Sequence, residues 1–516
     1  MKIPTRHNRV LFFLGGIFWA ALSGAQSLLF PADYMFDITR QRALALDTTA
    51  TIHTSLQPYV YDHVEVDTFK NLKWGVDNFF DKLLYEDLIS LKHIDRSSGY
   101  PRKFNLTIDP ILDLHYGKDL KDSGDAKVQY NTRGFWLHGE LGKKLIFESA
   151  FIENQAFTPV YIFNYGKATG VVPGQGRWKK FRDNSGFDYA TAYGILNFTA
   201  SKNFTVRLGH GKQKVGNGYR SLLLSDNALN YPYAQFIASF FKGKMQYSQT
   251  YALLMNLTDG GAKTPPSTEP IFQKKAASFQ QLSFRTGRYF DVYFFQGMIW
   301  KATDSSNTMH LDAFYANPII FTNLAKYGFN NYNHILAGGG FELRPYRRLQ
   351  IYGQWMYDGH YQHAIPNYFT PNWGVQGGVK YYDAFGVKDL YLQLETNFLT
   401  GKSYYSQKSS YQDYSHYNQV LTTPAVLPNE GVLFISYKYK RFFIQLKENI
   451  QTDNSSTAAF NYFDGKVGYM INPRYNASFA IGSNIRSLVY PGAKASEMNQ
   501  VYISLRTALY NLYNDF

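Results

Sequence analysis

The chain has 516 residues, which is enough for two or three ordinary domains or for one large closed β-barrel. It contains no cysteine, which excludes disulfides, thiolate metal sites, a cysteine nucleophile and the lipid-bearing cysteine of a bacterial lipoprotein. Aromatic residues make up 18% of the chain although its mean hydropathy is only −0.33, which favours a membrane barrel over a globular core. The net charge of +14 favours anionic partners, among them acidic polysaccharide and lipopolysaccharide phosphates, or it serves solubility alone.

Residues 1–25 have the pattern of a secretory signal peptide. Three basic residues precede an apolar run from Val10 to Leu22, and small residues follow at 23–25, so we expect cleavage before Gln26. The apolar run is too short for a membrane-spanning helix, and no later stretch approaches ~18 consecutive apolar residues. Insertion into a membrane would therefore have to use strands.

Residues 26–98 are predicted to form a helical segment on the periplasmic side. Leu28 to Asp47 is rich in helix-forming residues, with Asp33 as the expected N-cap. Leu72 to Leu91 carries apolar residues at helical spacing.

From about Phe104 the apolar period changes to two, which places successive side chains on opposite faces of a wall. In Asp389 to Phe398, leucines alternate with Tyr391, Gln393 and Glu395. Charged residues beside leucine would be costly in a dry core, whereas in a barrel they face water. We therefore expect residues 99–516 to form a large all-β, antiparallel transmembrane barrel.

The connections between these segments alternate between short and long, as in outer-membrane barrels. They separate about eighteen strands, and sixteen is also compatible with the pattern. The last strand is expected to include Tyr510, Leu512 and Phe516 as an aromatic girdle and insertion signal. A barrel of this width would hold water unless loops or the N-terminal helices fill it. The short connections are Gly142 to Lys144, Ser201 to Asn203, Gly243 to Lys244, Arg288 to Tyr289, Arg344 to Arg348, Asp383 to Lys388, Lys440 to Arg441 and Ile471 to Arg474.

The loop from His210 to Phe236 combines glycines with an apolar triplet, Leu222 to Leu224. Its glycines permit close approach of the backbone but do not complete G-x-G-x-x-G, so a dinucleotide site is excluded. The triplet indicates that the loop folds inward, either for packing alone or as part of a ligand site.

Several short motifs of this chain resemble one family of outer-membrane proteins. Ser221 to Ala228 (SLLLSDNA), preceded by Gly216-Asn217-Gly218 and followed by Pro232, resembles the signature of the capsule-assembly Wzi family. Other stretches resemble its Bacteroidetes branch, which includes proteins similar to the gliding-motility protein RemB. They are Ile52 to Tyr59 (IHTSLQPY), Asn317 to Phe321 (NPIIF), Tyr352 to Asp358 (YGQWMYD), Val379 to Gly386 (VKYYDAFG) and Ser415 to Gln419 (SHYNQ).

The resemblance implies a wide, plugged barrel above an N-terminal helical bundle that holds capsular polysaccharide at the cell surface. In the gliding branch it implies a role in surface motility. The chain departs from that branch at Thr422 to Glu430 (TTPAVLPNE), which leaves the outer end of this loop and its ligand preference open.

The candidate polysaccharide-binding residues are aromatic, basic and amide side chains in three long loops. Sugar CH faces pack on aromatic rings, and acidic sugars pair with Arg and Lys. Alternatively, the tyrosines mark the membrane interface or pack loops together, and the basic cluster meets lipopolysaccharide phosphate. The candidates are Trp178, Lys179, Lys180, Arg182, Tyr219, Arg220, Asn227, Tyr231, Tyr404, Tyr405, Tyr411, Tyr414, His416 and Tyr417.

We expect no enzyme, metal or cofactor, because the chain lacks H-E-x-x-H, G-x-S-x-G and zinc-like histidine pairs. Glu148 and Glu153 have an odd spacing within one strand, so they cannot form a carboxylate pair. The leading hypothesis is an outer-membrane protein that binds an acidic surface polysaccharide and has no nucleic-acid partner. One alternative is a channel for anions, with Lys438, Lys447 and Arg506 facing the lumen. Another is an adhesin or gliding component that docks on other surface or motility proteins.

Overall fold

The computed structural model describes sixteen stretches of the chain. The predicted signal peptide, residues 1–25, lies outside them, as does most of the predicted helix Leu72 to Leu91. The described residues are 26–29, 33–46, 52–62, 89–95, 102–121, 127–142, 144–182, 185–259, 272–303, 315–328, 333–359, 372–400, 403–404, 413–472, 475–507 and 511–516.

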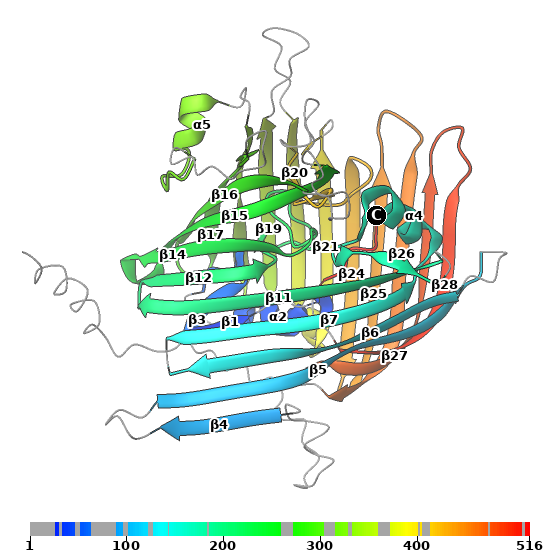
Figure 1. Cartoon of the computed structure of the whole chain (residues 1–516), viewed down its shortest axis with the longest axis horizontal. Helices are drawn as coiled ribbons and strands as arrows, with labels where there is room; N and C mark the ends of the chain where they lie inside the picture. Colours follow the sequence, from blue (N-terminus) through cyan, green and yellow to red (C-terminus); the bar gives the residue numbers. More distant parts are fainter. Residues whose placement is uncertain are drawn as a thin grey trace, which may run out of the picture.

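Eighteen antiparallel strands close into a single barrel, which confirms the predicted fold class and strand number (Figure 1). The ring closes where β28 pairs with β5, from Gln500 opposite Asp119 to Arg506 opposite Asp113. The wall strands are β5 (Arg102–Asp119), β6 (Lys127–Leu141), β7 (Leu145–Phe157), β11 (Gly186–Ser201), β12 (Phe204–Gly211), β14 (Tyr231–Phe240), β15 (Met245–Asp259), β16 (Phe272–Arg285), β17 (Phe290–Lys301), β18 (His334–Tyr346), β19 (Leu349–Gly359), β20 (Asn372–Tyr382), β21 (Leu390–Leu399), β24 (Asn429–Tyr439), β25 (Phe442–Thr452), β26 (Ala459–Asn472), β27 (Ala477–Val489) and β28 (Ser496–Arg506).

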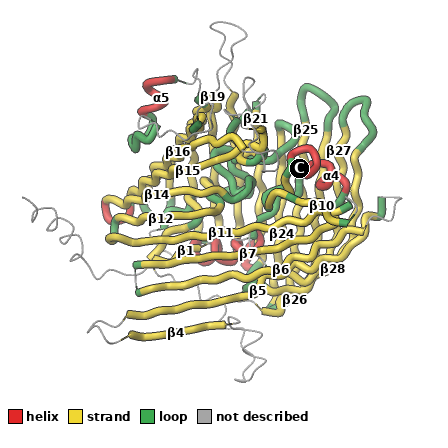
Figure 2. Tube along the Cα trace, viewed as in Figure 1, coloured by secondary structure: helices red, strands yellow, loops and turns green. Residues whose placement is uncertain are grey.

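The connections alternate as predicted, so the barrel has a short-turn rim and a long-loop rim. The short turns include two 3-10 helices, η3 (Phe241–Gly243) and η4 (Ala384–Gly386). The long connections carry α4 (Val160–Thr169) and α5 (Thr322–Tyr327), and the wall between the rims is almost entirely strand (Figure 2). They also carry the short strands β8 (Val171–Val172), β9 (Gly176–Arg177), β10 (Lys179–Phe181), β13 (Lys214–Val215), β22 (Ser415–His416) and β23 (Gln419–Val420).

Burial along the wall follows the predicted period of two. On β21, Leu394 is 62% exposed, whereas Gln393 and Glu395 on either side of it are at most 1% exposed. The apolar side chains therefore point outward and the polar ones point into the lumen, which is the pattern of a lipid-facing barrel. No helix within the described stretches has the length and apolar character needed to cross a bilayer.

Side-chain amides link neighbouring strands on the luminal face. Gln296 Nε2 donates to Gln280 Oε1 at 3.0 Å, and Gln280 Nε2 donates to Gln249 Oε1 at 2.8 Å. Gln235 continues this row by donating to Ser248 and Thr250. Because buried amides are costly unless they are hydrogen-bonded, this face gains stability from its own network.

The described part of the predicted N-terminal segment is only partly helical. Helix α2 (Tyr34–Leu46) lies within the predicted range, and Asp33 caps it by accepting the Met35 N–H at 3.0 Å. The described residues of this segment also form four strands, which are β1 (Gln26–Leu29), β2 (Leu56–Gln57), β3 (Tyr59–Asp62) and β4 (Ile89–Asp95). β4 pairs with the N-terminal part of β5, from Arg102 to Ile108. Leu91, which was predicted to end a helix, therefore belongs to a strand.

Helix α2 lies in the lumen of the barrel, near the short-turn rim. Tyr34 OH donates to Gln393 Oε1 of β21 at 2.6 Å. Arg42 donates twice, at 2.9 Å each, to the carboxylate of Asp383 in the turn between β20 and β21. The lumen is therefore occupied by both the N-terminal helix and the long loops, two of the possibilities that the sequence left open.

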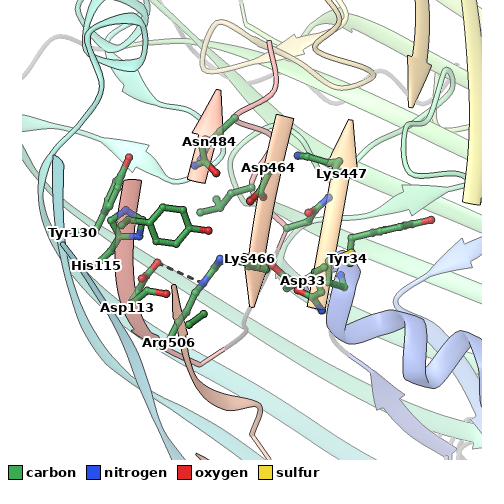
Figure 3. Close-up of a pocket in the computed structure, with 18 of the residues that line it drawn as sticks. Asp33, Tyr34, Asp113, His115, Tyr130, Lys447, Asp464, Lys466, Asn484 and Arg506 are labelled. Atoms are coloured by element: carbon green, nitrogen blue, oxygen red, sulfur yellow. Dashed lines mark hydrogen bonds and ion pairs between the residues drawn. The ribbon is translucent and has the colours of Figure 1, made fainter. Parts of the chain in front are cut away.

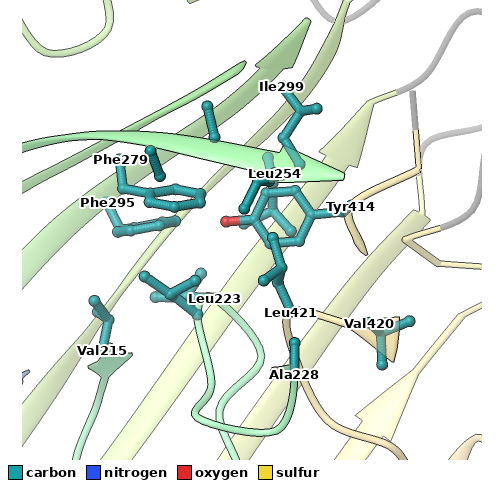
Figure 4. Packing of buried hydrophobic residues seen from close by; sticks show 14 of the residues in the cluster. Val215, Leu223, Ala228, Leu254, Phe279, Phe295, Ile299, Tyr414, Val420 and Leu421 are labelled. Atoms are coloured by element: carbon teal, nitrogen blue, oxygen red, sulfur yellow. The ribbon is translucent and has the colours of Figure 1, made fainter. Parts of the chain in front are cut away.

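Loop residues 212–230 fold inward, as the apolar triplet predicted. Leu222, Leu223 and Leu224 are at most 1% exposed and pack with aromatic residues of β16 and β17 (Figure 4). Residues 413–428 join them, because Ser225 N–H donates to the Leu421 carbonyl at 2.6 Å. We call α2, residues 52–62, residues 212–230, residues 413–428 and residues 511–516 together the plug.

The last six residues belong to the plug and not to the wall, so the predicted terminal girdle strand is wrong. β28 ends at Arg506, and Asp515 is fully buried in the lumen, where Arg220 Nη2 donates to its carbonyl at 3.0 Å. Phe516 packs on Tyr161 of α4, with ring centroids 5.7 Å apart, which brings the C-terminal end beside α4 (Figure 1). Tyr510 lies outside the described residues.

Candidate functional site

A buried ion cluster joins loop 212–230, the tail and the wall. Arg220 Nη2 donates to Glu430 Oε1 at 2.8 Å, and Arg220 Nη1 lies 3.2 Å from Asp515 Oδ1. Lys447 Nζ lies 3.2 Å from the other oxygen of Asp515. Two cations and two carboxylates therefore balance inside the lumen, with the side chains of Arg220, Glu430 and Asp515 fully buried.

Opposing charges shift the pKa values of Asp515 and Arg220. Burial alone would raise the pKa of Asp515, but Arg220 and Lys447 outweigh it and hold that pKa below its usual value. Burial likewise lowers the pKa of Arg220, and Asp515 and Glu430 raise it by more. Asp515 and Arg220 are thus ionised and paired with each other at neutral pH.

Two of the resemblance motifs meet in the plug. β2, within Ile52 to Tyr59, pairs with β13, and Gly216 N–H donates to the Ser55 carbonyl at 2.8 Å. Gly216 has φ +124°, and a Cβ there would collide with Gln354 of β19. A Cβ at Gly218 would lie 2.6 Å from Glu395, whose carboxylate accepts the N–H groups of the next two residues. The two glycines therefore allow the backbone of loop 212–230 to approach the wall closely.

The candidate residues of loop 212–230 are covered by the chain itself. Tyr219, Arg220 and Tyr231 are at most 2% exposed, and Asn227 is 7% exposed. Tyr219 OH lies 3.1 Å from Asp515 Oδ2, and Asn227 Nδ2 donates to the Val420 carbonyl at 3.1 Å. In this arrangement they hold the plug together.

Three candidates of the tyrosine-rich loop, Tyr404, Tyr414 and His416, are also buried. Tyr404 OH donates to the Leu222 carbonyl at 3.2 Å, and Tyr414 is fully buried. His416 accepts the Met255 N–H through Nδ1 at 3.0 Å, and its Nε2 lies 3.1 Å from the Asn230 carbonyl. Tyr417 OH contacts the Met255 sulfur at 3.2 Å. Tyr405 and Tyr411 lie outside the described residues.

The basic cluster of the loop between β7 and β11 is divided between packing and surface. Trp178 packs on Phe187, with ring centroids 4.8 Å apart, and its Nε1 donates to the Gly166 carbonyl of α4 at 2.8 Å. Lys179, Lys180 and Arg182 are exposed along β10 and its following turn. Of the twelve candidates that lie within the described stretches, these three cations are the exposed ones, where a large ligand can reach them.

A polar cavity of 180 Å³ lies between the plug and the wall of β5, β6 and β24 to β28. It extends from Asn476, in a short turn, to Thr158 and Tyr161 at the start of the α4 connection. Figure 3 shows Tyr130, His115 and Asp113 on one side of this space and Tyr34 and Lys447 on the other.

The three basic residues predicted to face the lumen all line this cavity, and each has a partner. Lys438 donates to Thr39 Oγ1 at 3.0 Å, and Lys447 pairs with Asp515. Arg506 lies 3.5 Å from Asp113 and 3.7 Å from Asp33. Carboxylates therefore balance the charges of Lys447 and Arg506, and Lys438 is hydrogen-bonded to a hydroxyl group.

Sequence reasoning did not find the carboxylates and aromatics of this cavity. Asp113 and His115 alternate with apolar Leu112 and Leu114 on β5, so the period of two could have placed them in the lumen. Glu148 is 3% exposed while Glu153 is exposed, which confirms that these two lie on opposite faces. Within the described stretches, no three histidine or carboxylate side chains are grouped so that they could hold a metal ion.

No protein-family model matches the chain, and no curated protein matches it. Solved structures do resemble it. Wzi of Escherichia coli, described as a carbohydrate-binding β-barrel involved in group 1 capsule assembly, is 12% identical with a TM-score of 0.51, over 94% of this chain and 100% of that one. OccAB2 of Acinetobacter baumannii is 10% identical with a TM-score of 0.46 (78% and 98% covered), and OccK3 of Pseudomonas aeruginosa is 11% identical with a TM-score of 0.43 (78% and 96%). The likeness to Wzi shows a shared fold, as the motifs predicted, and the gliding branch stays a prediction.

Proposed function

We propose that this chain is an outer-membrane protein that binds or anchors an acidic surface polysaccharide. The observation that carries the proposal is the filled lumen beside an exposed basic loop. The plug is fixed to the wall by buried ion pairs, while Lys179, Lys180 and Arg182 remain exposed near the long-loop rim. A fixed plug favours a binding surface over a flow path. The likeness to Wzi, which is itself described as carbohydrate-binding, also supports a binding function.

The binding energy would come from many weak contacts along one polymer. An exposed Lys or Arg paired with a carboxylate contributes little alone, about 0 to 1 kcal/mol. A chain of repeating acidic sugars raises the effective concentration of each next contact. Binding should therefore need a long glycan and should weaken in high salt, where the Debye length falls to ~3 Å.

The test replaces the three exposed cations together by serine, leaving the packed Trp178 intact. The control removes the same charge at the short-turn rim, through the exposed Lys202, Lys244 and Arg288. We expect the loop variant to lose most retention of purified acidic polysaccharide in a pull-down, and the control to keep it. Equal retention by both variants would exclude the loop as the binding surface.

A diffusion channel is the second candidate, favoured by the polar cavity beside the plug. Conductance across a planar bilayer separates the two functions. A steady open pore in the wild-type protein would favour the channel, whereas a closed barrel that retains glycan favours the binder. An adhesin or gliding role stays a prediction, and co-purification of surface proteins from native membranes would support it.

A further inference from the structure

We propose that the luminal cavity holds a single sugar residue, a six-membered ring that carries several hydroxyl groups. The inference rests on the proposed function and deepens it, because it adds an interior subsite to the exposed loop. It is argued from the size of the cavity, its unsatisfied polar atoms, its aromatic walls and its charge balance.

The size of the cavity suits one ring. Its 180 Å³ has room for about a dozen water molecules, at ~15 Å³ each. A pyranose with its hydroxyl groups has a comparable number of non-hydrogen atoms. Sites for drug-sized ligands measure about 300 to 1,000 Å³, so this cavity is too small for an oligosaccharide.

Three lining residues carry buried polar atoms without a hydrogen-bond partner in the described structure. They are the carboxylate oxygen Oδ1 of Asp113, the hydroxyl of Thr158 and the amide nitrogen of Asn511. Asn511 is 7% exposed. The Asp113 oxygen accepts a hydrogen bond, the Thr158 hydroxyl can donate or accept one, and the Asn511 nitrogen donates. A sugar hydroxyl also donates and accepts, so it matches each of the three in kind.

Aromatic rings line the same space. His115 stacks on Tyr502 with ring centroids 4.3 Å apart, and Tyr130 meets the edge of His115 at 5.1 Å. Tyr462 lies across the cavity, with Lys447 Nζ 5.0 Å from its ring centroid. The CH face of a sugar packs on such rings while its hydroxyl groups reach the polar atoms.

The charges of the lining favour a sugar over a free anion. Asp33 and Asp113 flank Arg506, and Asp515 accepts Lys447, so two of the four lining cations are paired with carboxylates. Of the other two, Lys438 donates to Thr39, and Lys466 shares its face of β26 with Asp464. An inorganic anion would have to compete with these carboxylates. Hydroxyl groups can bind both members of an ion pair without separating them.

The test fills the cavity from the wall. Ala480 of β27 lines it and is 4% exposed, whereas the next residue, Ile481, is 54% exposed on the outer face. Ala480→Phe therefore fills the cavity, and Ile481→Phe is the matched control. Saturation-transfer NMR of the full barrel with glucose, galactose and glucuronate, and with phosphate by titration calorimetry, measures binding.

We expect binding of at least one sugar by wild type and Ile481→Phe, and a loss of about tenfold or more in Ala480→Phe, or about 1.4 kcal/mol. Thr158→Val with Asn511→Leu removes two of the orphan atoms without filling the space and should weaken binding severalfold. This double variant decides the question if Ala480→Phe does not fold, as judged by its heat-dependent gel mobility. Equal sugar binding in all variants, no sugar binding by wild type, or binding of phosphate alone would overturn the inference.

Polysaccharide retention, measured in the same preparations, separates this inference from the proposed function. Retention by wild type without any monosaccharide binding would overturn the cavity site and leave the proposed function standing. Monosaccharide binding that only the cavity variants lose, without polymer retention, would support the cavity site and overturn the proposed function.

Discussion

Arg220 links loop 212–230 both to the wall and to the C-terminal tail. Its guanidinium meets Glu430 and Asp515, and its backbone N–H donates to Glu395 at 3.0 Å. Removing one member of such a cluster leaves buried charge without compensation, which typically costs about 3–5 kcal/mol. The opening of the plug should therefore depend strongly on this side chain.

We predict that Arg220→Met loosens loop 212–230 while the wall stays closed. A loss of about 3 kcal/mol corresponds to about 100-fold faster amide exchange through local opening. Hydrogen exchange followed by mass spectrometry measures this in the peptides of the loop. Arg182→Met, an exposed arginine, is the control and should leave exchange unchanged. Unchanged exchange in Arg220→Met would mean that the buried pairs do not hold the plug.

His416 makes the inner hairpin β22–β23 sensitive to acid. Burial, followed by the nearby charge of Lys275, lowers the pKa of His416 to about 3. The neutral ring accepts from Met255 N–H at Nδ1, so a second proton would place two donors against each other. A histidine whose folded pKa is depressed gives stability that is present above its unfolded pKa of ~6.5 and is lost as pH falls toward 3.

We therefore predict that the free energy of unfolding of the plug decreases by a few kcal/mol between pH 6.5 and about 3. His416→Asn keeps an acceptor near Nδ1 but does not titrate, so its stability should be lower at pH 7 and should change less over this range. Urea unfolding at a series of pH values, followed by tryptophan fluorescence in detergent, measures both. Parallel curves for the two proteins would show that another group controls the acid response.

At the scale of single residues, sequence reasoning proposed a chemistry for the candidate side chains but could not place them in the fold. Trp178 and Lys179 are adjacent and were predicted to act together, yet one packs under α4 and the other is exposed. Tyr404 and Tyr414 were predicted to contact a ligand, and both are buried. Tyr404 bonds to loop 212–230, and Tyr414 belongs to the plug itself. Aromatic rings serve sugar binding and loop packing equally well, and only the tertiary path of the loop decides between these uses.

Among the elements, the C-terminal tail shows why local patterns are ambiguous. An aromatic and apolar alternation ending at Phe516 fits a girdle strand, but it fits a buried tail as well. In the structure, Asp515 pairs with Arg220 and Lys447 in the lumen, and these contacts hold the tail there. Those partners are distant in sequence, so the tail could not be placed from its own residues.

We predict that Tyr513 fastens this tail to the plug. Its hydroxyl donates to Asp226 Oδ1 at 2.6 Å and lies 3.0 Å from the Tyr219 carbonyl, and the residue is 3% exposed. Truncating a buried aromatic side chain costs about 3–5 kcal/mol, so Tyr513→Ala should release the tail.

The chain has no cysteine, so a single Asn514→Cys gives a unique thiol for measuring release. Its reaction with a maleimide should become about tenfold faster or more when Tyr513→Ala is added, since ~1.4 kcal/mol already corresponds to tenfold in opening. Tyr490→Ala, an exposed tyrosine between β27 and β28, is the matched control. Equal labelling rates with and without Tyr513 would show that the tail is held by other contacts.

For the whole molecule, the alternation of side chains and of loop lengths predicted the closed wall correctly, because both follow from local geometry that each strand repeats. The contents of the lumen depend on contacts between residues such as Tyr34 and Gln393, hundreds of positions apart. Such long-range pairing has no periodic signature. The wall was therefore predictable, whereas of the plug only the inward fold of loop 212–230 and the filling of the lumen by loops or N-terminal helices could be predicted.

The same wall geometry predicts opposite responses to charge on its two faces. On β26, Val467 is 52% exposed on the outer face, and the preceding Lys466 already lines the cavity. An arginine facing lipid near the bilayer midplane costs about 2–4 kcal/mol, so Val467→Arg should lower the free energy of unfolding in lipid vesicles by that amount. Lys466→Arg introduces the same side chain one position away, on the wet face, and should change stability by less than about 0.5 kcal/mol. Urea titration of both variants in vesicles, compared with the same titration in short-chain detergent, measures the difference. If Val467→Arg were as stable in vesicles as Lys466→Arg, the outer face would not meet a hydrocarbon layer, and the proposed membrane location would be excluded.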